Sequence, residues 1–245
     1  MRPLAGRVII MCLSSLDMAE PRLLFGTVGK DASTVQSFAE DLKDHGGHPA
    51  KISEVTIDMS KGLIAGVEKS LPKAQITFDK FHTVKLINEA VEATRREEQK
   101  SHEELKRSRY LWLKNPKNLR REEASRLAHL LDCSYLKTGR AYRMKLAFQA
   151  LYSESRSTAD AYLKRWYFKA THSRLPAMIK VAHTVKDHWE GILRWFDTGL
   201  TTGLLEGMNS IIQAAKAKAR GYSNPEYLIT IAYLIAGDLK FNLPT

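Results

Sequence analysis

Residues 54–60 read EVTIDMS and residues 74–82 read AQITFDKFH, and these two stretches decide the fold class. Each contains a short run of residue types that favour an extended chain, and each run ends at an aspartate, Asp58 in the first and Asp79 in the second. Such runs predict β-strands. Glu206, far downstream in the stretch LEGMN, lies early in a segment with a helical pattern. Carboxylates at two strand ends and on a distant helix predict an acidic pocket.

An acidic pocket of this kind offers hard oxygen ligands, which suit Mg²⁺ or Mn²⁺. Two such ions can stabilise both the attacking and the leaving oxygen of a phosphoryl transfer. Each acid also has a plainer interpretation. Asp58 can cap the helix that begins after it, and Glu206 can be an acid that the helix dipole favours near an N-terminus. The local sequence leaves both interpretations open.

The first 80 residues predict a mixed α/β sheet. Arg7–Leu13 and Arg22–Val28 are strand-like, and residues 17–21 between them supply turn residues. After Asp31, apolar residues recur at intervals of three and four, which predicts a helix that ends at Gly46-Gly47. With the two strands described above and an amphipathic helix between them, the predicted order is β-β-α-β-α-β.

Beyond residue 81 the strand signal nearly vanishes, and the pattern predicts helices. Five aromatic residues are expected on buried helix faces, with base-stacking platforms as the alternative: Trp166, Tyr167, Phe168, Trp189 and Trp195. The predicted helices cover residues 81–109, 120–132, 138–153, 157–171 and 174–195, followed by the helix of Glu206 and a last helix that begins near Pro225. The chain is therefore expected to be a small α/β unit, interrupted by a large helical insertion and closed by two helices.

Composition narrows the function classes. The chain has 245 residues, of which 44% are apolar, and no uninterrupted apolar run of membrane-spanning length, so no membrane partner is expected. Cys12 and Cys133 are far apart and form no C-x-x-C pair, which argues against a disulfide framework and a zinc ribbon. A reducing, cytoplasmic location is the default expectation.

The net charge of +11 is unevenly distributed. Residues 1–80 contain ten Lys/Arg and ten Asp/Glu, whereas residues 81–245 contain 28 and 17, so 28 − 17 = +11. An excess of this size favours a polyanionic partner through phosphate contacts and counterion release. A solvated basic surface is the alternative. Together with the acidic pocket, the charge favours nucleic acid.

Seven segments occur in an informative order and spacing: GKDA (29–32), IDMS (57–60), FDKFH (78–82), RYLWLKNP (109–116), HWEGIL (188–193), EGMN (206–209) and KARGY (218–222). Through them, nearly the whole chain resembles the catalytic part of bacterial insertion-sequence transposases of the DDE type, specifically the ISL-three group. The resemblance implies an RNase H-like fold with an α-helical insertion before the last catalytic acid. Residues 1–85 would be a partial RNase H-like α/β unit that lacks its first strand, residues 86–200 the insertion, and residues 201–245 the C-terminal helices that complete the unit.

The resemblance also implies roles for single residues. Asp58 would be the second acid of the catalytic triad and Glu206 the third, and both would be metal ligands. Asp79 and His82 resemble a D-x-x-H motif of related transposase groups, with Asp79 in a supporting role. His82 would contact DNA phosphate or orient a carboxylate, and a buried structural histidine remains the alternative.

Four residues at and beyond the Glu206 helix are candidates for DNA binding. They are Asn209, Lys216, Lys218 and Arg220. The three cations cluster near the helix end, from where they could reach phosphates. A favourable interaction with the helix dipole explains them equally well.

One part of the family pattern is expected before Arg7: the strand with the first catalytic acid, and the zinc-binding and helix-turn-helix segments that recognise terminal inverted repeats. The sequence is therefore expected to be a truncated form whose two-metal site for Mg²⁺ or Mn²⁺ is incomplete. Two hypotheses follow. One is a transposase catalytic domain that cleaves DNA and joins strands, with impaired or no activity. The other is a non-catalytic remnant that binds DNA or full-length transposase. Terminal inverted repeats and target DNA are the expected partners, at the bacterial nucleoid, and a homo-oligomer is left open.

Overall fold

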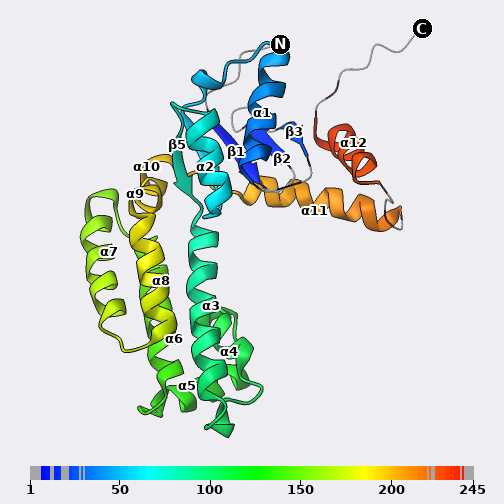
Figure 1. The fold of residues 1–245 in the computed structure, drawn as a ribbon. Coiled ribbons are helices and arrows are strands. Elements are labelled where there is room, and N and C mark those ends of the chain that lie inside the picture. Colours follow the sequence, from blue (N-terminus) through cyan, green and yellow to red (C-terminus); the bar gives the residue numbers. More distant parts are fainter. Residues whose placement is uncertain are drawn as a thin grey trace. The chain divides into compact units, whose positions relative to one another are not determined.

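The computed structural model describes residues 7–11, 14–17, 22–27, 29, 31–219, 221, 224–237 and 239. The chain divides into two compact units (Figure 1). The α/β unit comprises Met1–Asp79 and Thr198–Thr245, and the helical unit comprises Lys80–Asp197. Within the described residues, no helix combines the length and the apolar character needed to cross a membrane.

A five-stranded sheet forms the centre of the α/β unit. Its strands are β1 (Arg7–Met11), β2 (Ser14–Asp17), β3 (Arg22–Gly26), β4 (Glu54–Ile57) and β5 (Gln75–Phe78). They are arranged in the order β3-β2-β1-β4-β5. The pairs β1–β2 and β2–β3 are antiparallel, whereas β1–β4 and β4–β5 are parallel. The expected mixed α/β character is confirmed.

The number of strands differs from the sequence-based prediction. That prediction has one strand over Arg7–Leu13, but the described chain reverses after β1, and Ser14–Asp17 pairs back on it with Met11 opposite Ser14. Two residues separate the strands, which is the length of a tight hairpin connection. No glycine, asparagine or aspartate stands between them, so the sequence contains no signal for the reversal. In the same sheet, β4 is paired on both sides, by β1 and by β5.

Helices α1 (Ala32–Asp44) and α2 (Lys61–Ser70) lie side by side in the α/β unit (Figure 1). Asp31 starts α1, because its Oδ1 accepts hydrogen bonds from the backbone N–H of Ser33 at 3.0 Å and of Thr34 at 3.2 Å. Gly66 allows the close packing, since a Cβ there would lie 2.9 Å from the Cα of Ala32. A 3₁₀ turn, η1 (Pro49–Lys51), leads from α1 to β4.

The last two helices, α11 (Gly203–Lys218) and α12 (Pro225–Ala236), complete the α/β unit. The Tyr233 hydroxyl of α12 accepts a hydrogen bond from the backbone N–H of Gly26 at 3.0 Å. Leu23 of β3, Ile212 of α11 and Ala232 of α12 form one buried apolar cluster. The C-terminal helices are thus packed against the edge strand β3.

The helical unit is built around four long helices: α3 (Lys80–Glu98), α6 (Lys137–Leu151), α7 (Arg156–Thr171) and α8 (Pro176–Asp187). Each packs against two of the others, so that they form a bundle in the order α3-α6-α7-α8 (Figure 1). Shorter elements connect and extend it: η2 (Glu103–Leu105), α4 (Arg109–Leu113), η3 (Pro116–Asn118), α5 (Arg121–Asp132), α9 (Trp189–Leu193) and α10 (Trp195–Thr198).

Two predicted helices are shorter in the structure. The one predicted to reach Arg109 ends at Glu98, and the one predicted over 174–195 is broken at His188 and again at Arg194 into α8, α9 and α10. The first break is stabilised by Trp189, whose indole N–H donates to Asp160 of α7 at 2.9 Å. Phe168 is also not a core residue, because it is 63% exposed. It stands two positions from the buried Trp166, and a helix cannot turn both toward one core.

Candidate functional site

The register of the parallel strands places Asp58 and Asp79 side by side. Ile57 at the end of β4 is opposite Phe78 at the end of β5, so the next residues, Asp58 and Asp79, leave the sheet at the same edge. Adjacent strands are about 4.8 Å apart. Asp58 is half-buried, whereas Asp79 is fully buried. Asp79 therefore needs hydrogen-bond donors around it.

Those donors come from the start of α11. The Oδ2 atom of Asp79 accepts hydrogen bonds from the Thr201 hydroxyl at 3.0 Å, from the Thr202 hydroxyl at 2.6 Å and from the Thr202 backbone N–H. Thr202 is the N-cap residue of α11. Asp79 thus ties the N-terminus of α11 to the end of β5, across 123 residues of sequence.

Glu206 stands in the first turn of α11 and is exposed. Its Oε1 lies 3.5 Å from the same Thr202 hydroxyl, and its backbone N–H donates to the Thr202 carbonyl at 2.9 Å. Glu206 is therefore linked through Thr202 to Asp79, which lies beside Asp58. The two threonines are partners of Asp79 that the sequence did not predict. Their only local signal is a Thr-Thr-Gly helix start.

Asp58 does not cap α2. The N-cap residue is Ser60, and the Asp58 Oδ1 accepts a hydrogen bond from the Ser60 backbone N–H at 2.8 Å in the turn that precedes the helix. The capping interpretation is therefore wrong. Within the described residues, the second carboxylate oxygen of Asp58 has no protein partner.

The described residues contain no group of three or more His, Cys, Asp or Glu side chains that is arranged to hold a metal ion. Asp79 is engaged by Thr201 and Thr202 at the start of α11, whereas Asp58 is half-buried and Glu206 is exposed. Strand β1, which lies between β2 and β4, has the sequence RVIIM and contributes no acid.

The other candidates on α11 fall on different faces. With about 3.6 residues per turn, Asn209 and Lys216 lie about 60° and about 80° to one side of Glu206, whereas Lys218 lies about 120° to the other side. Asn209 and Lys216 are half-buried and Lys218 is exposed. Lys216 and Lys218 occupy the last turn, as the dipole interpretation requires. Arg220 lies outside the described residues.

His82 stands in the first turn of α3, in the helical unit. It is half-buried, and its Nε2 is buried without a hydrogen-bond partner among the described residues. Buried polar nitrogens are nearly always paired, so Nε2 of His82 is an exception among the described residues.

The charge of the chain is divided between the two units. The helical unit, residues 80–197, contains 25 Lys/Arg and 14 Asp/Glu, so 25 − 14 = +11. The α/β unit contains 13 of each and is neutral. The whole excess of positive charge therefore belongs to the helical unit, and the candidate acids belong to the neutral unit.

Comparison with known proteins identifies the family. A family model described as a transposase, of the DDE type and the ISL-three group, matches residues 5–232. The chain therefore belongs to this transposase family. No solved structure matches it.

Two curated relatives illustrate the similarity. The transposase for insertion sequence element IS1001 from Bordetella parapertussis is 31% identical over 208 residues, which cover 81% of this chain and 50% of the relative. The transposase for insertion sequence element IS1557 from Mycobacterium tuberculosis (strain CDC 1551 / Oshkosh) is 25% identical over 257 residues, which cover 94% of this chain and 57% of the relative. The chain thus spans about half the length of these relatives.

Proposed function

We propose that this chain is the catalytic part of a DDE-type transposase, which cleaves DNA and joins DNA strands, and in which Asp58 and Glu206 are the second and third catalytic acids. The observation that carries the proposal is the hydrogen bonding of Asp79 with Thr201 and Thr202, because it fixes the first turn of α11 at the sheet edge where Asp58 lies. Asp79 has the supporting role.

The proposal includes an RNase H-like fold. Three antiparallel strands followed by two strands parallel to the first, in the order β3-β2-β1-β4-β5, support it. The helical unit would then be the insertion, and α11 and α12 would complete the RNase H-like unit.

Asp58 and Glu206 fit a divalent cation by their chemistry, since both offer hard oxygen ligands at accessible positions. A bound Mg²⁺ or Mn²⁺ would stabilise negative charge on the reacting phosphate. By the family resemblance, two carboxylates make an incomplete two-metal site. We therefore propose weak metal binding and impaired or no cleavage.

DNA is the proposed substrate, with terminal inverted repeats and target DNA as its two forms. The charge of the helical unit would attract the phosphate backbone. Asn209 and Lys216 lie to the same side of Glu206 and would position the strand next to the metal. His82 would contact a DNA phosphate or orient an active-site carboxylate, as the resemblance implies. Lys218 and Arg220 are further phosphate contacts in this proposal.

The alternative is a non-catalytic remnant that binds DNA or that acts as a partner of full-length transposase. The concentration of positive charge in the unit without the candidate acids favours it, since DNA binding would then not depend on the metal site.

Mn²⁺ titration followed by electron paramagnetic resonance tests the metal site. We expect Asp58→Asn and Glu206→Gln each to weaken Mn²⁺ binding by about tenfold or more, because each removes one charged ligand. Matched controls are Asp44→Asn on α1 and Glu226→Gln, another glutamate in the first turn of a helix, and both should bind like the wild type. Equal binding by all four variants would refute the site.

Supercoiled plasmid with Mn²⁺ then separates the two functions. Nicking that Asp58→Asn abolishes supports the enzyme, and DNA binding without nicking supports the non-catalytic alternative.

A further inference from the structure

The turn at residues 106–110 of the helical unit joins η2 to α4 in an unusual backbone conformation. Arg107 has a φ of 55°, in the left-handed region that few residues other than glycine adopt. Such a conformation costs free energy and persists where the surroundings impose it. Arg126 of α5 contributes, because its guanidinium donates to the Lys106 carbonyl at 2.7 Å and to the Arg107 carbonyl at 3.5 Å.

The turn is also anchored from the interior. Ser108 is fully buried, and its hydroxyl donates to the Leu105 carbonyl at 2.6 Å while accepting the indole N–H of Trp112 at 2.9 Å. Trp112 itself is fully buried. The backbone of the turn is therefore fixed on both sides of Arg107.

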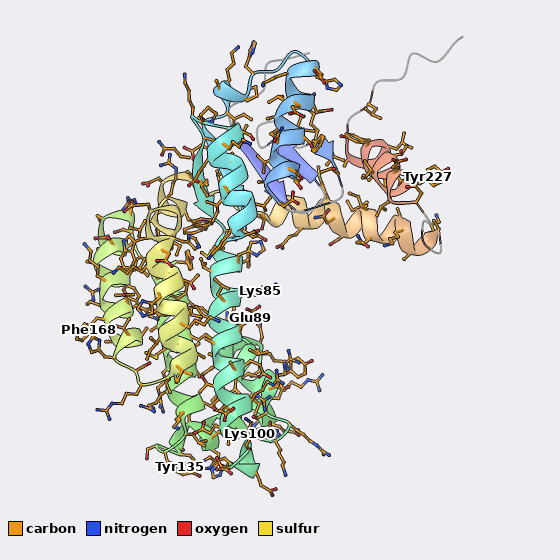
Figure 2. All side chains as sticks on the ribbon, in the orientation of Figure 1. Lys85, Glu89, Lys100, Tyr135, Phe168 and Tyr227 are labelled. Carbon is orange, nitrogen blue, oxygen red and sulfur yellow. The ribbon has the colours of Figure 1, made fainter. Side chains whose placement is uncertain are left out.

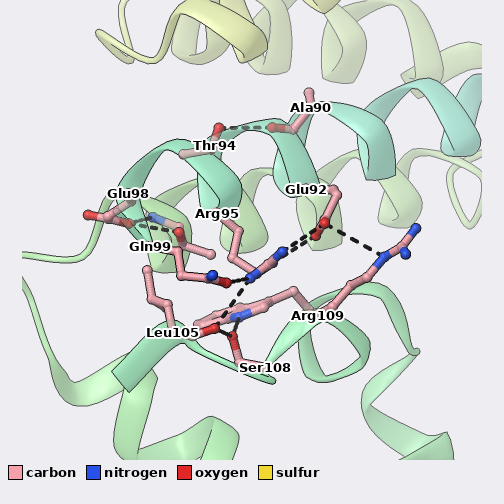
Figure 3. A network of polar contacts seen from close by, with 11 residues as sticks. Ala90, Glu92, Thr94, Arg95, Glu98, Gln99, Leu105, Ser108 and Arg109 are labelled. Atoms are coloured by element: carbon pink, nitrogen blue, oxygen red, sulfur yellow. Dashed lines mark hydrogen bonds and ion pairs between the residues drawn. The ribbon is translucent and has the colours of Figure 1, made fainter. Parts of the chain in front are cut away.

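The ion pair between Arg95 and Glu92 orients the side chain of Arg109 (Figure 3). Arg95, which is buried, pairs with Glu92 through two hydrogen bonds of 2.8 Å. The hydrogen bond from Arg95 is the main cause that lowers the pKa of Glu92, and the nearby Arg109 lowers it further. The Glu92 Oε1 lies 3.6 Å from Nε of Arg109. An ionised Glu92 thus orients Arg109 on the surface.

The side chain that the turn presents is Tyr110, which is 65% exposed and lies next to the Arg109 guanidinium, 5.7 Å from ring centroid to Cζ. Tyr135 and Phe168 are two other exposed aromatic residues of this unit, both labelled in Figure 2. The Tyr135 hydroxyl donates to the carboxylate of Glu104 at 3.0 Å. Phe168 is stacked on a histidine. The ring of Tyr110, by contrast, is exposed and lies beside the guanidinium of Arg109.

The surrounding sequence is strongly basic. Residues 106–126 contain eight Lys/Arg and two Asp/Glu, so 8 − 2 = +6, which is more than half of the net charge of the chain. An aromatic ring flanked by cations is the arrangement that binds single-stranded nucleic acid, because bases stack on the ring while phosphates contact the cations.

We propose that Arg107, Arg109 and Tyr110 form a contact for unpaired DNA, in which Tyr110 stacks on a base and the two guanidinium groups bind the flanking phosphates. Duplex DNA does not offer a free base face, so the contact discriminates in favour of a single strand. The inference takes DNA as the partner from the proposed function but is independent of Asp58 and Glu206.

Fluorescence anisotropy with a labelled mixed-sequence oligonucleotide, single-stranded or in a duplex, tests the contact in EDTA, so that metal-dependent cleavage plays no part. We expect Tyr110→Ala to weaken single-strand binding about tenfold and duplex binding less than about twofold. Tyr110→Phe should bind like the wild type. Arg109→Gln should weaken both and lower the salt dependence of binding.

Tyr135→Ala is the matched control, since it removes an exposed tyrosine of the same unit that is bonded to an acid. It should bind like the wild type. The proposal is refuted if Tyr110→Ala leaves single-strand binding unchanged, weakens duplex binding equally, or behaves like Tyr135→Ala. Because the assay contains EDTA, failure of this contact leaves the proposed metal site untouched.

Discussion

Asp79 is a buried carboxylate whose partners are remote in sequence. The pattern of residues 74–82 predicts an acid at a strand end, and the Thr-Thr-Gly sequence at 201–203 predicts a helix start, but nothing local relates the two. By contrast, the helix that follows Asp31 is predictable, because Asp31 bonds residues two and three positions away. Local capping can be read from sequence, whereas a hydrogen bond across 123 residues depends on the completed sheet.

Asp79→Ala should release the N-terminus of α11. It leaves three donors at Thr201 and Thr202 without their acceptor, and each hydrogen bond to a charged group contributes about 1.5–3 kcal/mol. We expect faster amide hydrogen exchange in peptides that cover the start of α11, measured by mass spectrometry, together with weaker Mn²⁺ binding. Asp79→Asn keeps a carbonyl oxygen as acceptor. We therefore expect slower amide hydrogen exchange at the start of α11 in Asp79→Asn than in Asp79→Ala.

Tryptophan fluorescence provides the control for this variant. All four tryptophans belong to the helical unit, so its unfolding midpoint should not change. Unaltered exchange in α11 would show that Asp79 does not anchor the helix.

Helix ends in the helical unit are also set by distant residues. The charged, helical pattern after residue 81 continues to Arg109, yet α3 ends at Glu98. The Glu98 carboxylate accepts the backbone N–H groups of Lys137 and Thr138 at 2.7 Å each, which satisfies the N-terminus of α6. Amphipathic spacing predicts that α3 and α6 exist, because it is a local property. The cap that the last residue of α3 provides for α6 joins residues 40 positions apart, so it cannot be read from either segment alone.

The C-terminus of α4 is completed by a lysine from another helix. Lys145 of α6 is fully buried, and its Nζ donates to the carbonyls of Trp112 and Leu113 at 2.7 Å and of Lys114 at 3.3 Å. Burial lowers the pKa of Lys145 from 10.5 to about 8. Nothing in the sequence around Lys145 distinguishes it from the exposed lysines of the chain.

This lowered pKa predicts a pH dependence of stability. Between pH 8 and 10.5 the unfolded chain retains a proton on Lys145 that the folded chain has lost, so the free energy of unfolding rises with pH. The rise is at most about 1.4 kcal/mol per pH unit. Below pH 8 both states are protonated, and the stabilisation is lost.

Urea unfolding followed by tryptophan fluorescence at pH 7.5, 8.5 and 9.5 checks this dependence, with Lys145→Met as the comparison. The difference in stability, wild type minus variant, should increase with pH. The tyrosines with raised pKa values, Tyr142 and Tyr162 among them, are present in both proteins and cancel. A constant difference would show that Lys145 keeps its proton, stabilised by the three carbonyls.

For the molecule as a whole, the sequence predicts a mixed sheet followed by helices, and the structure confirms this coarse order. Short alternating strands and long amphipathic helices have different periods, which makes the class readable. The hairpin from β1 to β2 was not predictable, since it lacks turn residues. The sequence showed where the excess charge lies along the chain, and the structure adds that it coincides with one compact unit.

This separation predicts that the helical unit makes the larger electrostatic contribution to the binding of duplex DNA. A variant with Lys169, Lys180 and Lys186 changed to Gln removes three exposed cations from α7 and α8. Its plot of log K against log salt concentration should be less steep by up to about 0.9 for each phosphate that the protein no longer binds. The matched control changes Lys51, Lys69 and Lys73, three exposed lysines of the α/β unit, to Gln. This control removes as many positive charges as the test variant. We expect its slope to equal that of the wild type, because the removed lysines make no contact with phosphate. Fluorescence anisotropy measures the slopes from about 50 to about 300 mM salt, a range over which phosphate binding is resolved. Equal slopes for both triple variants would place the DNA elsewhere on the protein.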